Sequence, residues 1–182
     1  MQALPSDMRS PVFKIILKNG GEAEFEQVKS YYVTATDNAE KKHVLNSLGA
    51  VGDVKLKRAV LDWTTGGEVK LQDFFYAIGS VHRSGKEGQE LTWSYFKDNF
   101  DRFNSMLEKA SASLMDAVIV YSCGGFTSTA MADEIEEFFK AKDMAKNARK
   151  ISQTVESMRA NAKFAELLAK SEISKDSFWD GL

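Results

Sequence analysis

Apolar residues recur every three or four positions along most of the chain, the spacing of one buried helix face. Leu56, Val60 and Trp63 form one such stripe, and residues 151–165 carry a longer one. No segment alternates apolar and polar residues between turn signals, as a half-buried strand would. Both prolines fall within the first eleven residues, so the rest of the chain lacks this strong helix breaker. The pattern therefore predicts an all-α protein.

We predict about nine helices with short connections, followed by a short tail helix near 174–180. The nine span residues 7–19, 22–35, 38–50, 53–64, 70–82, 86–109, 113–124, 128–141 and 145–171. Residues whose side-chain oxygen can accept the free N–H groups of a first helical turn precede four of these runs. They are Asp53, Ser84, Ser113 and Ser128.

An internal repeat indicates how the helices associate. Segments 48–51, 78–81 and 123–126 read LGAV, IGSV and CGGF, so each is apolar, glycine, small and apolar. Fourteen residues after the first glycine of each segment stands an aromatic residue: Trp63, Trp93 and Phe138. The three segments fit an irregular solenoid of helix pairs in which each glycine ends a helix. We expect a single helical domain over residues 1–182.

Composition excludes several classes of partner. The formal net charge is −2, which does not favour nucleic acid or an acidic membrane surface. No apolar run has the length of a membrane helix or the form of a signal peptide. The single cysteine, Cys123, cannot form an internal disulfide. We expect a soluble, cytoplasmic protein.

A self-contained active site is not visible. The two histidines, His43 and His82, are 39 positions apart, and the His-Glu-x-x-His zinc motif does not occur. We interpret both as surface residues. Cys123 lacks a neighbouring base and occupies the repeat position of Leu48 and Ile78, so we interpret it as a small buried apolar residue. We therefore predict no catalytic residue and no metal ligand in this chain.

One helical segment is strongly basic. Between Lys140 and Lys170 there are eight basic residues and three acidic ones. Arg149 and Gln153 fall on the side of this helix that faces away from its apolar stripe. This side is either a basic surface that attracts the carboxylate of a peptide, or an ordinary solvated helix face.

Several segments, in this order, resemble the C-terminal domain of zinc aminopeptidases of the puromycin-sensitive type. They are SDMRSPVFKIILKNGG, NSLGAVGDVKLKRAVLDWT, VKLQDFFYAIGSV, GQELTWSYFKDNFD, SCGGFTS and ARKISQTVESMRANAKF, and the resemblance runs from about Leu4 to Leu168. It implies stacked antiparallel helix pairs in an irregular HEAT-like superhelix. It also implies that the zinc site and the Gly-Ala-Met-Glu-Asn loop lie in an earlier catalytic domain.

In that case the chain is a C-terminal fragment of a larger enzyme and has no cofactor of its own. The resemblance implies a non-catalytic lid that encloses the peptide cavity, limits peptide access and contacts the parent's catalytic domain. Residues expected to contact the far end of a peptide are Arg149, Gln153 and Arg159.

Two other functions stay open at this point. A free-standing HEAT-like scaffold could bind partner proteins along its concave face. The gene would distinguish it from a lid, because only the lid requires His-Glu-x-x-His upstream of Met1. A stand-alone enzyme that uses Cys123 is the third option, and assays of the purified chain with and without zinc would test it.

Overall fold

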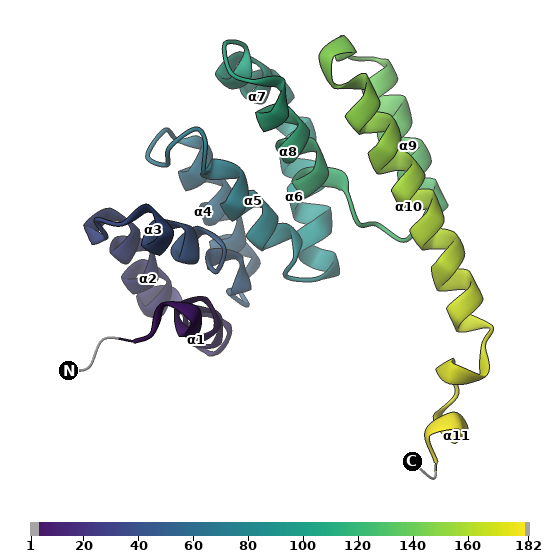
Figure 1. The fold of residues 1–182 in the computed structure, drawn as a ribbon, viewed down its shortest axis with the longest axis horizontal. Helices are drawn as coiled ribbons and strands as arrows, with labels where there is room; N and C mark the ends of the chain where they lie inside the picture. Colours follow the sequence, from purple (N-terminus) through teal and green to yellow (C-terminus); the bar gives the residue numbers. More distant parts are fainter. Residues whose placement is uncertain (1–3, 181–182) are drawn as a thin grey trace. The chain divides into compact units, whose positions relative to one another are not determined.

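The computed structural model describes residues 4–180, and every regular element in that range is helical. The α-helices are α1 (Ser6–Asn19), α2 (Glu22–Thr34), α3 (Asn38–Leu45), α4 (Val54–Thr65), α5 (Phe74–His82), α6 (Lys86–Asp98), α7 (Phe100–Leu107), α8 (Ala112–Cys123), α9 (Thr129–Lys140), α10 (Ala148–Ala169) and α11 (Asp176–Trp179). Three short 3₁₀ turns join them: η1 (Leu48–Ala50), η2 (Ala145–Asn147) and η3 (Glu172–Ser174). The prediction of an all-α protein is confirmed (Figure 1).

The chain divides into two compact units, one up to Ser122 and the other from Cys123 onward. That the two units form one domain stays a prediction, as does the HEAT-like form of the helix stacking. No helix between residues 4 and 180 is both long enough and apolar enough to cross a membrane.

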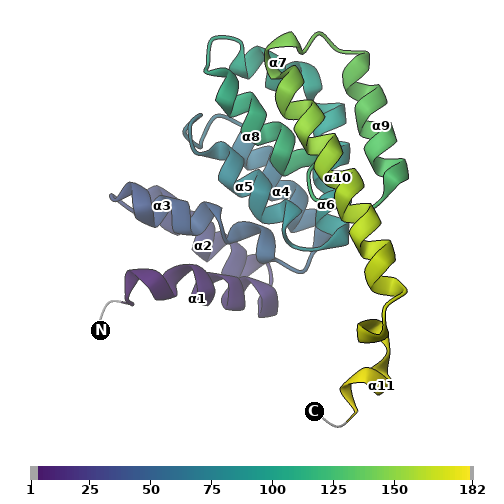
Figure 2. The same cartoon turned by 45° about the vertical axis from the view of Figure 1, so that its right-hand side comes forward.

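In the first unit α5 is the central helix. It packs against four elements: α3, η1, α4 and α6. The helices α1, α2 and α3 pack on one another, as Figures 1 and 2 show from two directions. Aromatic side chains fill the interior: the ring centroids of Phe96 and Phe103 are 5.4 Å apart, and those of Phe74 and Phe103 are 6.3 Å apart.

One long predicted helix, 86–109, is in fact two. α6 ends at Asp98 and α7 begins at Phe100, with Asn99 between them at φ −114° and ψ 18°. The Asn99 side chain donates to the Tyr95 carbonyl at 2.9 Å, so the amide satisfies the backbone where the helix breaks. The break lets Phe103 turn back onto Phe96. A similar break divides the predicted helix 38–50 into α3 and η1.

Two of the four predicted helix caps are confirmed. Asp53 accepts a hydrogen bond from the Lys55 N–H at 2.7 Å, and Ser128 accepts one from the Met131 N–H at 3.4 Å. The other two are wrong. Gly85, not Ser84, precedes α6, because the Ser84 hydroxyl donates instead to a carbonyl of α5. Ser113 lies inside α8.

The repeat marks buried positions, but its glycines do not all end helices. Its apolar positions are buried in all three copies: Leu48, Val51, Ile78, Val81, Cys123 and Phe126. Gly124 follows the end of α8, as predicted, whereas Gly79 lies inside α5. What Gly49 and Gly79 share is close approach: a Cβ atom on Gly49 would lie 2.2 Å from the Ser80 backbone, and one on Gly79 2.8 Å from the Tyr121 ring. The prediction that each glycine ends a helix is therefore wrong for Gly79.

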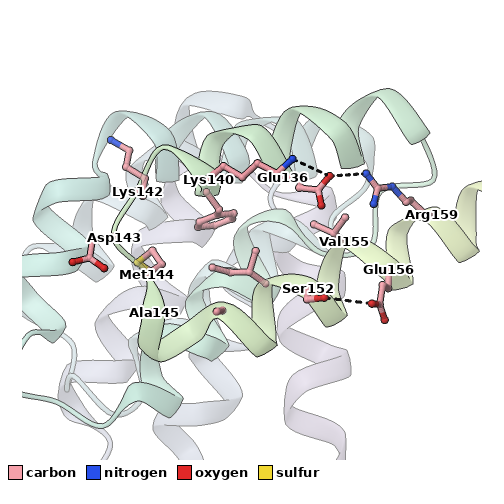
Figure 3. Close-up of a pocket in the computed structure, with 13 residues that line it drawn as sticks. Glu136, Lys140, Lys142, Asp143, Met144, Ala145, Ser152, Val155, Glu156 and Arg159 are labelled. Atoms are coloured by element: carbon pink, nitrogen blue, oxygen red, sulfur yellow. Dashed lines mark hydrogen bonds and ion pairs between the residues drawn. The ribbon is translucent and has the colours of Figure 1, made fainter.

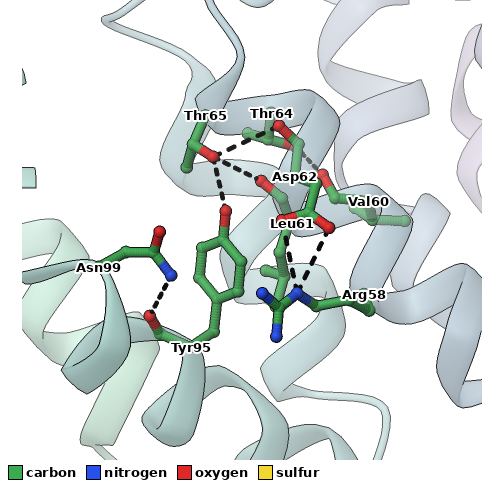
Figure 4. A network of polar contacts seen from close by, with 8 residues as sticks. All are labelled: Arg58, Val60, Leu61, Asp62, Thr64, Thr65, Tyr95 and Asn99. Carbon is green, nitrogen blue, oxygen red and sulfur yellow. Dashed lines mark hydrogen bonds and ion pairs between the residues drawn. The ribbon is translucent and has the colours of Figure 1, made fainter. Parts of the chain in front are cut away.

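A polar network links α4 to α6 inside the first unit (Figure 4). The Tyr95 hydroxyl lies 2.7 Å from the Thr65 hydroxyl, and Thr65 also donates to the Leu61 carbonyl at 3.0 Å. The Arg58 guanidinium lies over the Tyr95 ring, 4.7 Å from its centroid, and pairs with Asp62. Buried hydroxyl groups are therefore satisfied where the two helices cross.

The second unit is built on α9 and α10, which pack directly against each other. Ile135 and Phe139 of α9 are buried, as are Val155, Met158 and Ala162 of α10. These positions recur at three to four residues, so each helix presents one apolar stripe to the other.

Candidate functional site

A pocket of about 430 Å³ lies in the second unit, where α9 ends, η2 turns and α10 begins. Its lining residues are Glu136, Phe139, Lys140, Lys142, Asp143, Met144, Ala145, Ala148, Ile151, Ser152, Val155, Glu156 and Arg159. Figure 3 shows apolar side chains at its centre and charged side chains around the rim. Phe139, Met144 and Val155 are almost fully buried. The pocket thus has an apolar floor of the kind that receives a side chain.

Arg159 is the predicted peptide contact that the structure places at this pocket. Its guanidinium donates to the Asp133 carboxylate at 2.7 Å and to the Glu136 carboxylate at 2.8 Å (Figure 3 draws the second bond). These hydrogen bonds raise the pKa of Arg159 and, from the other side, lower the pKa of Glu136. The charge of Arg159 is therefore already compensated by α9.

The remaining charges of the rim also balance. Lys140 lies 2.7 Å from Glu137 and 3.8 Å from Glu136, and the first of these contacts raises the pKa of Lys140. The pocket lining as a whole contains three basic and three acidic side chains. The pocket is therefore amphipathic and not an electropositive receptor.

Arg149 and Gln153 lie elsewhere on α10. Both are exposed, and neither lines the pocket. At 100° per residue, Gln153 is about 160° and Arg149 about 120° around the helix axis from Val155, whereas Arg159 is only about 40° away. The structure thus separates the three predicted residues into two groups, with Arg159 facing α9 and the other two on the solvent side.

Arg149 has no carboxylate partner among residues 4–180. It is the predicted contact whose guanidinium remains available to an anion. Contact with a peptide by any of the three residues stays a prediction.

The acidic partners of Arg159 were missed in the sequence. Glu136 reads as part of a solvated face of an amphipathic helix and Asp133 as an acidic residue of a first helical turn, because nothing local shows that α10 runs beside them. Their spacing of three residues was the one available signal, since it places both carboxylates on the same side of α9.

The prediction of a surface position is wrong for His82. This side chain is only 7% exposed, and its Nδ1 atom lies 3.2 Å from the Thr92 hydroxyl. The reason is the central position of α5, which leaves little of that helix in contact with water. His43 is half-buried, with its two ring nitrogens 3.3 Å and 2.8 Å from the hydroxyls of Ser6 and Ser10.

Nucleophilic and metal-binding groups are not assembled in the described part of the chain. Cys123 is fully buried, and burial raises the pKa of its thiol. A thiol of this kind is a poor nucleophile, since the thiolate is the reactive form. Between residues 4 and 180 no three His, Cys, Asp or Glu side chains are grouped so that they could hold a metal ion.

Comparison with known proteins shows the family. Residues 1–160 match the family model described as the ERAP1-like C-terminal domain. Because this match covers most of the chain, the protein belongs to that family. The resemblance to the C-terminal domain of aminopeptidases is thereby confirmed.

Individual relatives carry aminopeptidase names. Aminopeptidase 2, mitochondrial, of Saccharomyces cerevisiae is 28% identical over 163 residues, which cover 90% of this chain and 17% of the yeast protein. Aminopeptidase M1-A of Oryza sativa subsp. japonica is 28% identical over 166 residues, covering 90% of this chain and 18% of the rice protein. Puromycin-sensitive aminopeptidase of Caenorhabditis elegans is 24% identical over 170 residues, covering 88% and 18%. The chain thus spans less than a fifth of the length of these relatives.

Proposed function

We propose that this chain is the non-catalytic C-terminal domain of a zinc aminopeptidase, where it encloses the substrate cavity and limits which peptides enter. The observation that carries the proposal is the family match over residues 1–160, together with relatives whose names describe aminopeptidases. In such an enzyme the catalytic domain is the chain's intramolecular partner, and peptides are its ligands. A cytoplasmic location is part of the proposal and needs its own measurement, since the name of the yeast relative includes the word mitochondrial.

The zinc of such an enzyme does not fit this chain's own residues. His82 is buried beside Thr92, and the ring nitrogens of His43 lie next to two serine hydroxyls. A catalytic zinc requires three protein ligands that converge on one point. We therefore assign zinc binding and peptide-bond hydrolysis to another domain.

In this proposal the chain contributes a surface on α10 whose polar side chains can contact a peptide. Arg149 is an exposed guanidinium without a carboxylate partner among the described residues, and Gln153 lies about one turn further along α10. A guanidinium offers several N–H donors to a carboxylate, and the amide of Gln153 can donate one more. Arg159 is held by two carboxylates of α9, so we expect Arg149 to contribute more to peptide binding.

Steady-state kinetics of the full-length aminopeptidase test the proposal. Arg149→Ala is expected to raise KM for peptides of about ten residues by about two- to fivefold, the range of one exposed charge pair. KM and kcat for a single-residue amide should not change, because that substrate does not extend to the lid. Lys170→Ala, which removes an exposed charge at the end of α10, is the matched control. Equal effects of Arg149→Ala on both substrates would refute the assignment.

A second measurement addresses the absence of catalysis. The purified chain is expected to release no amino acid from peptides, with or without added zinc. Turnover that depends on this chain would show that it contains an active site and would overturn the proposal.

A further inference from the structure

Three partly exposed aromatic rings adjoin one another on the surface of the first unit. Phe75 and Tyr76 belong to α5, and Tyr121 belongs to α8. The ring centroids of Phe75 and Tyr76 are 4.4 Å apart, and those of Phe75 and Tyr121 are 6.0 Å apart with only 9° between the ring planes. We call these three side chains the aromatic platform. Its rings are neither buried in the core nor fully covered, so they can accept a further planar or apolar group.

Arg83 lies beside this platform in a defined position. Its guanidinium carbon is 5.4 Å from the centroid of the Tyr121 ring, and its Nη2 atom donates to the side-chain oxygen of Asn46 at 3.2 Å. Arg83 is exposed, yet it forms no ion pair with any residue between 4 and 180.

Three other arginines of the chain differ in this respect. Arg9 pairs with Glu40, Arg58 pairs with Asp62, and Arg159 is held by two acidic residues of α9. Arg83 is thus oriented by an aromatic ring and an amide while its charge remains uncompensated. An arginine that is held in one orientation but has no ion pair is suited to a carboxylate ligand, because the remaining N–H donors of its planar guanidinium are already oriented.

Gly79 makes room for this arrangement. A Cβ atom at position 79 would lie 2.8 Å from Arg83 Nη1 and 2.8 Å from Tyr121 Cδ1. A glycine inside a helix is less favourable than an alanine, so α5 by itself does not favour it. The repeat singled out this glycine as the end of a helix. In the structure its missing side chain leaves the space that the contact between Arg83 and Tyr121 occupies.

The platform also has a cation at its other end. The ammonium nitrogen of Lys42 lies 5.5 Å from the centroid of the Tyr76 ring and 3.8 Å from the Asp73 carboxylate. Tyr76 lies in α5 and Arg83 directly follows it, so the two are seven residues apart, or about 10 Å along the helix axis. About three residues of an extended peptide cover that distance.

We propose that Arg83 and the aromatic platform bind an acidic side chain of a peptide, with the neighbouring peptide residue lying on the rings. This inference rests on the proposed function, since peptides are the ligands of an aminopeptidase. The carboxylate receives N–H donors from Arg83, and the residue beside it packs on Tyr121 and Phe75. An acidic side chain is favoured over a peptide terminus because Arg83 is exposed, so a bound peptide chain can continue past it.

Fluorescence anisotropy with the complete 182-residue chain tests this site without any catalytic step. The probe is a fluorescein-labelled, C-terminally amidated nonapeptide with one Glu next to Phe, compared with the same peptide carrying Gln. At low salt we expect the Glu peptide to bind with a Kd at least about fivefold lower. Arg83→Gln should remove this preference, and Gly79→Ala should reduce it by displacing the guanidinium. Lys86→Gln, an exposed charge outside the platform, should leave it unchanged.

Two further comparisons between peptides test which group of the peptide is bound and whether Arg83 binds it. The Gln peptide with a free C-terminal carboxylate should bind no better than its amide, and a gain confined to this peptide would overturn the choice of an acidic side chain. Equal Kd values for the Glu and Gln peptides, or a preference that survives Arg83→Gln, would overturn the site itself. Arg83→Lys keeps the charge and should retain part of the preference, and thermal melts by circular dichroism verify that each variant is folded. Because no turnover is measured, failure here would leave the Arg149 kinetic test unaffected.

Discussion

Gly49 lies directly against the backbone of α5, with no room for a side chain. A Cβ atom there would lie 2.2 Å from both the carbonyl carbon of Ser80 and the amide nitrogen of Val81. These are backbone atoms of α5 and cannot rotate aside as a flexible side chain could. In addition, the Gly49 N–H donates to the buried Ser80 hydroxyl at 2.9 Å. We therefore predict that Gly49→Ala destabilises the first unit.

The magnitude follows from two contributions. Ordinary Cβ contacts are longer than 3.0 Å, so η1 and α5 must separate by about 1 Å, and overpacking of this kind costs roughly 1–3 kcal/mol. Separation also weakens the buried hydrogen bond, which adds about 1 kcal/mol. The lower entropy of the unfolded alanine chain returns less than about 1 kcal/mol. We expect a net loss of about 1–4 kcal/mol in the free energy of unfolding, which in the middle of that range lowers Tm by roughly 10 °C.

Urea denaturation, followed by circular dichroism and tryptophan fluorescence, measures this loss. Trp63 and Trp93 both belong to the first unit and report its unfolding. Gly52→Ala is the matched control, because a Cβ atom at Gly52 meets nothing within 4 Å. The control should differ from the parent chain by no more than about 0.5–1 kcal/mol. If Gly49→Ala and Gly52→Ala have the same unfolding free energy, the close approach of η1 and α5 is refuted.

Two other residues give separate predictions. Burial raises the pKa of the Tyr95 phenol above its ordinary value of 10.0, so ionisation favours the unfolded chain and stability is lost as the pH rises above about 10. Near pH 8 the unfolding free energy of Tyr95→Phe should be about 1 kcal/mol lower than that of the parent chain, because the variant lacks the hydrogen bond to Thr65. Between pH 9 and 11 its unfolding free energy should decline less than that of the parent chain. An equal decline would contradict the assignment. Cys123, whose burial raises the pKa of its thiol, should react with a thiol reagent at pH 8 only after denaturant is added, and rapid reaction in native buffer would contradict its burial.

The helical character of the chain could be predicted because it is a local property. The stripe through Leu56, Val60 and Trp63 lies within α4, and the cap at Asp53 forms as expected. Each of these signals lies within a few residues of the element it defines. The buried repeat positions could be predicted for a related reason, because the same packing position recurs along a stack of helices.

The predicted site residues depended on which helix lies beside α10, and that information is not local. Arg159 and Asp133 are 26 residues apart in the chain, yet their side chains are in contact. A count of basic residues between Lys140 and Lys170 could not show that α9 compensates Arg159 and that Arg149 has no carboxylate partner among residues 4–180. The Arg83 site was missed for the same reason, since Asn46 and Tyr121 are each more than 35 residues away from it.

The sequence by itself thus determined an all-α chain, most helix positions, the buried repeat positions and the resemblance to aminopeptidase C-terminal domains. Tertiary structure alone decided that Asn99 breaks a helix, that His82 is buried and that Gly79 lies inside α5. The physical reason is the range of the interactions. Helix periodicity and capping act over three to four residues, whereas burial, ion pairing and the space around a glycine depend on side chains brought together from distant parts of the chain.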